Sequence, residues 1–274
     1  MTEGVHRAAS ADGTSIAARF CGDGPPVVFV NGGGGDGDGS WATIVPLMAD
    51  RFTCFAMSTR GRGLSGDAYD HSCERLVDDV VAITDSLGGP VGIVGHSSGA
   101  SLALAVSATS TAIAAAALYE PTGVNEHQDA ETVAILERVT ASAREASDQG
   151  EHVEAARRFV EGCPFFNETE TLLMAQLGVF DFMAEYVSMW LDEIPEYLRA
   201  TDELAVDQVT APVLLLHGEQ THPSFTRAVH YFSTALSDAR AVQLPGVGHM
   251  APLFAADAVA DELSRFLSAT LEPR

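Results

Sequence analysis

The sequence contains no lysine. All 15 of its basic residues are arginines, and 38 acidic residues bring the net charge to −23. A strongly acidic surface repels nucleic acid and anionic membranes, and it disfavours a multiply anionic substrate. We therefore expect the partner to be a neutral or apolar small molecule, with neither nucleic acid nor a membrane involved.

Cysteines are few, and no apolar run is long. The four cysteines in 274 residues, Cys21, Cys54, Cys73 and Cys163, show neither a CxxC pattern nor metal-ligand spacing, so free thiols are expected. No apolar run reaches the ~20 residues that span a bilayer, and the first ten residues lack the order of a signal peptide. These absences predict a soluble, cytoplasmic protein. They leave the oligomeric state, including a homodimer, open.

The chain is organised around the pattern Gly-x-Ser-x-Gly at residues 95–99, where an apolar run meets a segment rich in small residues and leucine. This context predicts a strand, a one-residue elbow at Ser97 and a helix. In such an elbow a nucleophilic serine has strained backbone angles, and its hydroxyl projects above the sheet. The N–H of Ser98, at the helix N-terminus, would point where an oxyanion forms. The alternative is a strand-to-helix turn without chemistry.

A second glycine-rich stretch, residues 31–35, follows the apolar strand predicted at 27–30. In a hydrolase, the N–H of Gly33 would be the second oxyanion donor beside Ser98. A phosphate-binding loop would need a lysine or a complete Gly-x-Gly-x-x-Gly opening a helix, and Asp36 and Asp38 would repel phosphate. A flexible loop without a ligand is the remaining alternative.

Apolar runs alternate with helical patterns over most of the chain, which predicts an α/β fold with a mostly parallel eight-stranded sheet flanked by helices. The expected strands cover residues 5–7, 15–21, 27–30, 52–57, 91–95, 113–119, 212–218 and 239–244, the first two as an antiparallel edge. The expected helices of the core cover residues 41–49, 72–87, 98–109, 225–236 and 254–271.

Strand signals vanish between residues 124 and 201. Helical periodicity replaces them, with many bulky apolar residues between 165 and 191. This segment is expected to be a helical cap inserted into an α/β core made of residues 1–123 and 202–274. Most of its bulky side chains would pack the cap onto the core, and a few would face the cleft.

A serine hydroxyl needs a base within hydrogen-bond reach, and the base needs an orienting carboxylate. His249 is the expected base, because it lies in a glycine-rich loop after the last strand. His96 is expected to point away from the hydroxyl, and His217 ends a strand. The other histidines are expected at the surface: His6, His71, His127, His152, His222 and His230.

The acid is expected at Glu120. This residue follows the strand predicted at 113–119, and ligands of open α/β sheets bind at the carboxyl ends of strands. A solvated loop glutamate is the simpler alternative for Glu120, and Glu219 and Asp202 are the other candidates for the acid.

Three segments together resemble the α/β-hydrolase superfamily over nearly the whole chain. They are Gly-His-Ser-Ser-Gly (95–99), Arg-Gly-Arg-Gly-Leu-Ser (60–65) and Pro-Gly-Val-Gly-His (245–249). The chain departs from the common pattern at two positions: Thr221 stands where members often carry the acid, and Ser58 where an aspartate often precedes the arginine motif.

A subset of the superfamily, which includes the zearalenone-lactone hydrolases, carries the acid after the strand that follows the elbow helix. The chain resembles this subset at residues 97–101, at 120–122 and in the loop from Thr221 to Phe225. The resemblance implies that Glu120 is the acid of a Ser97–His249–Glu120 triad. It implies no metal and no organic cofactor.

The expected reaction is hydrolysis of a neutral, largely apolar carboxylic ester or lactone through an acyl-enzyme. Two alternatives stay open: a cofactor-independent oxygenase of the same fold, in which the serine is dispensable, and a non-catalytic small-molecule binder. An epoxide hydrolase or haloalkane dehalogenase would need an aspartate at position 97.

Overall fold

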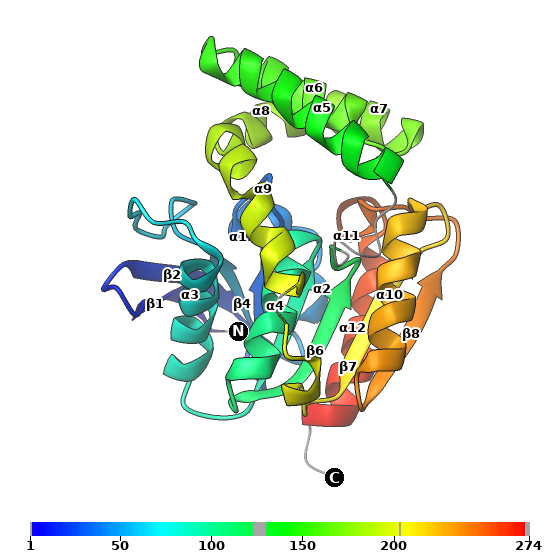
Figure 1. Ribbon diagram of the computed structural model, residues 1–274. Helices are drawn as coiled ribbons and strands as arrows, with labels where there is room; N and C mark the ends of the chain where they lie inside the picture. The colour runs from blue at the N-terminus through cyan, green and yellow to red at the C-terminus, as the bar shows by residue number, and fades with distance from the viewer. Residues whose placement is uncertain (1, 123–129, 203, 272–274) are drawn as a thin grey trace.

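Eight strands form one sheet in the computed structural model of the chain, which describes residues 2–122, 130–202 and 204–271 (Figure 1). The strand order is β1-β2-β4-β3-β5-β6-β7-β8; β1 and β2 pair antiparallel with their neighbours, and the other strands run parallel. The strands are β1 (Glu3–Ala9), β2 (Ser15–Cys21), β3 (Pro26–Val30), β4 (Thr53–Ser58), β5 (Val91–His96), β6 (Ile113–Tyr119), β7 (Val213–Gly218) and β8 (Ala239–Leu244).

The central strands are buried on both faces, as their continuous apolar runs predict. β3, β6 and β7 expose almost no side chain. Two apolar clusters cover the sheet, one on each face. The first packs under α3 (Cys73–Ser86), α4 (Ser98–Thr109) and α10 (Pro223–Ala235), and the second under α2 (Val45–Met48) and α12 (Ala256–Leu271) (Figure 1).

Two expected core helices start elsewhere than predicted. Of the range 41–49, only α2 is helical, and α1 (Gly37–Ser40) precedes it, because the Asp36 side chain starts α1 early by accepting from the Gly39 N–H at 2.7 Å. Pro46 then starts α2 in its first turn. The helix predicted over 254–271 is present as α12, and the non-helical backbone of Ala255 separates it from α11 (Ala251–Phe254).

Five helices are inserted between β6 and β7: α5 (Ala130–Asp148), α6 (His152–Gly162), α7 (Glu168–Gln176), α8 (Val179–Ala184) and α9 (Val187–Asp202). A short 3-10 helix, η2 (Val206–Gln208), leads from them back to the sheet. The inserted helices stand above the carboxyl ends of the strands, and α9 descends onto α4 (Figure 1). The expected start of the insertion at 124 lies outside the described residues, so the boundaries 1–123, 124–201 and 202–274 stay a prediction.

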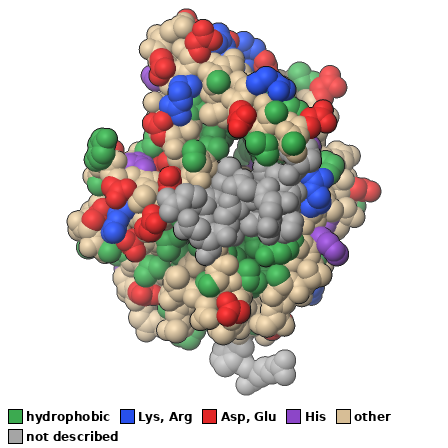
Figure 2. Space-filling model, viewed as in Figure 1, with side chains coloured by type: hydrophobic (Ala, Val, Ile, Leu, Met, Phe, Trp, Pro, Cys, Tyr) green, Lys and Arg blue, Asp and Glu red, His purple; other side chains and the backbone are tan. Residues whose placement is uncertain are grey.

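Figure 2 shows acidic side chains spread over both the inserted helices and the sheet-bearing part. Some ion pairs on this acidic background are local, such as that of Arg157 with Glu154 one turn earlier on α6. Within the described ranges, no helix combines the length and apolar character that a membrane crossing requires.

Candidate active site

Ser97 forms a sharp elbow between β5 and α4. Its backbone angles, φ 56° and ψ −125°, lie outside the regions that a serine ordinarily adopts. The elbow is tightly packed: a Cβ on Gly95 would lie 2.4 Å from the carbonyl oxygen of Gly99, and a Cβ on Gly99 would lie 2.3 Å from that of Asn31. The two flanking glycines therefore allow the strand and the helix to approach, and the strained serine expected from the sequence is present.

His249 and Glu120 are hydrogen-bonded to each other. His249 Nδ1 donates to Glu120 Oε2 at 2.6 Å, and the other carboxylate oxygen accepts from the Gly218 N–H at 2.8 Å. The glutamate is fully buried, and the histidine is 3% exposed. Glu120 also has a positive φ of 49°, which turns the chain at the end of β6 and directs the carboxylate toward the loop after β8.

The alternative acid Glu219 does not occupy this position. Glu219 is exposed, and its carboxylate accepts from the Gly246 N–H at 2.8 Å. The side chain of Asp202 lies outside the described residues. Thr221, at the position of the acid in many relatives, has a buried hydroxyl with no hydrogen bond among the described residues.

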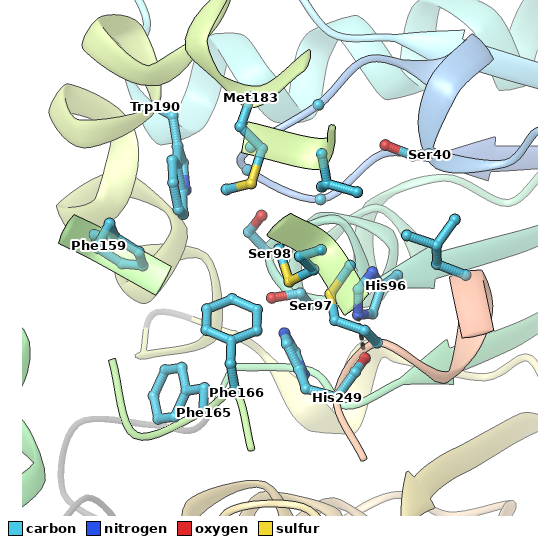
Figure 3. Close-up of a pocket in the computed structure, with 18 of the residues that line it drawn as sticks. Ser40, His96, Ser97, Ser98, Phe159, Phe165, Phe166, Met183, Trp190 and His249 are labelled. Atoms are coloured by element: carbon cyan, nitrogen blue, oxygen red, sulfur yellow. Dashed lines mark hydrogen bonds between the residues drawn. The ribbon is translucent and has the colours of Figure 1, made fainter. Parts of the chain in front are cut away.

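Ser97 and His249 line one cavity of about 310 Å³ (Figure 3). The imidazole and the hydroxyl face each other, although no hydrogen bond joins them in the described part of the chain. In ligand-free sites this bond is commonly long and tightens when substrate binds. Phe225 stacks on the imidazole, with ring centres 4.5 Å apart and planes 10° apart. Phe166 meets the same ring edge to face.

The rest of the cavity wall is mostly apolar. Its aromatic and sulfur-containing members come largely from the inserted helices and the segment before α7: Phe159, Phe165, Phe166, Met174, Phe182, Met183 and Trp190 (Figure 3). The described residues that line the cavity include no arginine, aspartate or glutamate. The buried hydroxyl of Ser98 reaches the cavity without a hydrogen-bond partner among those residues.

The glycine-rich loop 31–35 forms another part of the cavity wall, and the side chain of Asn31 fixes its peptide groups. The Asn31 amide donates to the carbonyls of Gly32 at 3.0 Å and Gly35 at 2.8 Å. Since a trans peptide directs its C=O and N–H oppositely, fixing the Gly32 carbonyl also fixes the direction of the Gly33 N–H. Trp190 covers this loop, because a Cβ on Gly33 would lie 2.0 Å from its Nε1.

Comparison with known proteins gives the family. Residues 27–262 match the sequence model of the alpha/beta hydrolase family. The chain belongs to that family. The chain is 23% identical to the 2-hydroxy-6-oxo-6-(2'-aminophenyl)hexa-2,4-dienoic acid hydrolase of Metapseudomonas resinovorans, over 96% of this chain and 91% of that protein.

Solved structures of other proteins have a fold similar to that of this chain. The enol-lactonase of Burkholderia xenovorans LB400 matches 96% of this chain and 100% of its own with a TM-score of 0.73 and 21% identity. The esterase RhEst1 of Rhodococcus sp. ECU1013 matches 97% of this chain and 99% of its own with a TM-score of 0.79 and 19% identity.

His96 was expected to point away from the hydroxyl of Ser97, and among the described residues no hydrogen bond joins these two side chains. Its ring lines the cavity, 4.7 Å from the ring of His249, and its Nε2 donates to the His249 carbonyl at 2.9 Å (Figure 3). Burial and the neighbouring His249 both lower the pKa of His96 well below its usual value. His96 therefore serves as a neutral donor that holds the backbone of residue 249.

A buried ion pair connects α9 to the sheet-bearing core. Arg62 donates to Glu193 at 3.1 and 2.5 Å, and also to the Gly33 carbonyl at 3.0 Å. Tyr197 donates to the same carboxylate. Burial opposes the charge of Glu193, but its bonds with His71 and Arg62 together hold its pKa below the usual range. Arg62 lies in the segment 60–65 that carries the family resemblance, but the sequence predicted no role for its side chain.

Three histidines expected at the surface are half-buried: His6, His71 and His222. His71 donates from Nδ1 to Glu193 at 2.6 Å and from Nε2 to Asp67 at 2.9 Å. The bond with Glu193 raises the pKa of His71 against the effect of its partial burial. His222 packs against Phe165. His127 lies outside the described residues.

Proposed function

We propose that the chain is a serine hydrolase that cleaves a neutral, largely apolar carboxylic ester or lactone through a Ser97–His249–Glu120 triad. The observation that carries the proposal is the 2.6 Å bond between Glu120 and His249, on a cavity that the strained Ser97 also lines. A carboxylate on Nδ1 leaves Nε2 as the basic nitrogen and stabilises the imidazolium that forms when it accepts a proton.

The reaction would run in two acyl-transfer steps. His249 Nε2 takes the proton of the Ser97 hydroxyl while Ser97 Oγ bonds to the substrate carbonyl carbon. The N–H groups of Gly33 and Ser98 hold the oxyanion, and each such donor typically lowers the barrier by ~3 kcal/mol. The imidazolium then protonates the leaving alkoxide, and the ester bond breaks. Water, deprotonated by the imidazole, releases the acid product and restores Ser97.

The cavity supports the substrate class. Its volume of about 310 Å³ falls in the range of small-molecule sites, and its wall is rich in aromatic rings. A substrate carboxylate would find no arginine among the described residues that line it. The family relatives include proteins named as an enol-lactonase and an esterase. The resemblance to zearalenone-lactone hydrolases favours a lactone.

A substrate panel tests the proposal. Purified protein would be assayed with p-nitrophenyl esters of increasing acyl length and with macrocyclic lactones, beside Ser97→Ala. We expect turnover of at least one substrate, and a loss of at least about a thousandfold in kcat/KM for Ser97→Ala, with an unchanged melting temperature. Oxygen uptake that survives in Ser97→Ala would instead indicate an oxygenase, and tight binding without turnover would indicate a binder.

A further inference from the structure

Glu170, in the first turn of α7, is a buried carboxylate beside the loop that carries His249. It is 5% exposed. Its Oε1 accepts from the Met250 N–H at 2.6 Å, and its Oε2 accepts from the Asn167 N–H at 3.1 Å. Over the described ranges, no arginine forms an ion pair with it. Among the described residues, two backbone N–H groups and the nearby His249 therefore support its charge.

The Met250 N–H belongs to the same peptide unit as the His249 carbonyl. That carbonyl accepts from His96 Nε2 at 2.9 Å, so side chains hold this peptide at both polar ends. The preceding loop carbonyl, that of Gly248, accepts from the Tyr119 hydroxyl at 2.6 Å. Two of the three clamping side chains, His96 and Tyr119, come from the sheet, and Glu170 comes from the inserted helices.

The N-terminus of α7 lies directly on this loop. A Cβ on Gly248 would lie 2.6 Å from Asn167 Nδ2 and 2.8 Å from Glu170 Oε1. Asn167 and Glu170 form a capping box, in which each side chain accepts from the backbone N–H of the other. The loop therefore needs glycine at 248 so that α7 can approach.

Glu120 is hydrogen-bonded to the imidazole of His249, and Glu170 to the N–H of the next residue, Met250. The other titratable groups around the imidazole carry no charge that offsets these two carboxylates. Glu120 approaches from the end of β6 and Glu170 from α7. His96, at the end of β5, is neutral, and burial raises the pKa of Tyr119 so that it also stays neutral. Burial raises the pKa of Glu170 as well, and the Met250 and Asn167 N–H groups oppose this effect.

We propose that Glu170 is a positioning residue for His249, one that both holds the 249–250 peptide and adds a second negative charge beside the imidazole. This inference rests on the proposed role of His249 as the base. A nearby anion favours the protonated imidazole, which is the form that the proposed reaction generates. The inserted helices would then supply a part of the base's environment as well as a cover for the cavity.

The test is the pH profile of kcat/KM for Glu170→Gln, with a p-nitrophenyl ester read at the isosbestic wavelength of p-nitrophenol. The amide oxygen of glutamine can still accept from Met250, but the charge is gone. We expect the midpoint of the acid limb to move down by roughly half a pH unit, and the plateau value of kcat/KM to fall about threefold. Should Glu170→Gln not fold, Glu170→Met, which is also uncharged and of similar length, must show the same shift.

Asn167→Ala is the matched control. It removes one bond of the capping box and weakens α7 by about 1 kcal/mol, but it keeps the Glu170 charge, so the midpoint should stay at its wild-type value. An unshifted midpoint in the Glu170 variants, or an equal shift in Asn167→Ala, overturns the inference. Ser97→Ala is assayed in parallel: if it is inactive, the proposed function stands even where the Glu170 inference fails.

Discussion

The inserted helices contact the sheet-bearing part through two buried glutamates that differ in their partners. At α9, Glu193 is neutralised by Arg62, and the same arginine holds the Gly33 carbonyl. At α7, Glu170 has two backbone N–H donors and a histidine nearby, and no arginine of the described chain neutralises it. The difference indicates a division of tasks, in which the α9 junction fixes the glycine-rich loop and the α7 junction sets the charge around His249.

The directions of the pKa shifts express the same contrast. The pKa of Glu193 is lowered, so its charge stabilises the fold above the carboxyl's ordinary pKa, and this contribution is lost as the pH falls through the lowered value. The pKa of Glu170 is raised by burial, so its contribution is present in acid and is lost as the pH rises through the raised value. A buried anion that costs stability near neutral pH suggests a functional reason for its presence.

The largest expected effect concerns Glu120, the carboxylate that is hydrogen-bonded to His249. Glu120→Gln should lower kcat/KM by about a thousandfold or more, because the imidazole loses its orienting anion. Its matched control is Glu219→Gln, at an exposed carboxylate that binds only a loop N–H among the described residues. Steady-state kinetics and a thermal melt of each variant check this. A near-wild-type rate for Glu120→Gln with a loss for Glu219→Gln would reassign the acid.

The α9 junction should show the largest effect on stability. Arg62→Met leaves Glu193 buried without its cation and should cost about 3–5 kcal/mol of unfolding free energy, measured by denaturant titration. The double variant Arg62→Met/Glu193→Leu should recover much of this loss, since both charges are removed together. Arg157→Met, at a solvent-exposed pair on α6, is the control and should change stability little. A double variant as unstable as the single one would contradict the assignment.

A smaller effect is expected from His71, which links Glu193 to Asp67. Its raised pKa means that its contribution is complete below the ordinary pKa of histidine and is lost as the pH rises through the higher folded value. The melting temperature of His71→Gln should therefore lie below that of the wild type, and the difference should be largest at about pH 5.5 and smallest at about pH 9. A deficit that does not change with pH would show that the charge of His71 adds nothing to the α9 junction.

The sequence predicted the sheet, and together with the family resemblance it favoured Glu120 as the partner of His249. Their positions follow from a general rule, that residues after parallel strands gather at one edge of the sheet. The strained elbow at Ser97 could also be predicted from the sequence, since Gly95 and Gly99 flank this serine between an apolar strand and a helix. The catalytic roles of these residues stay predictions, because geometry alone does not measure a reaction.

The two junctions could not be predicted, because periodicity identifies helices without showing which face of α7 or α9 meets which loop. Arg62 and Glu193 are 131 residues apart in the chain. One local signal was available: Asn167 followed three residues later by Glu170 is a capping-box pattern, which marks the start of α7. The bond from His96 to the His249 carbonyl could not be predicted either, because it joins residues 153 positions apart in the chain.

The most direct test of Ser97 as the nucleophile is mass spectrometry after treatment with a fluorophosphonate, with the labelled peptide sequenced. We expect one adduct per chain, on Ser97, with no adduct in Ser97→Ala and slow labelling in Glu120→Gln. An unmodified protein that still hydrolyses esters, or an adduct on another residue, would contradict the triad.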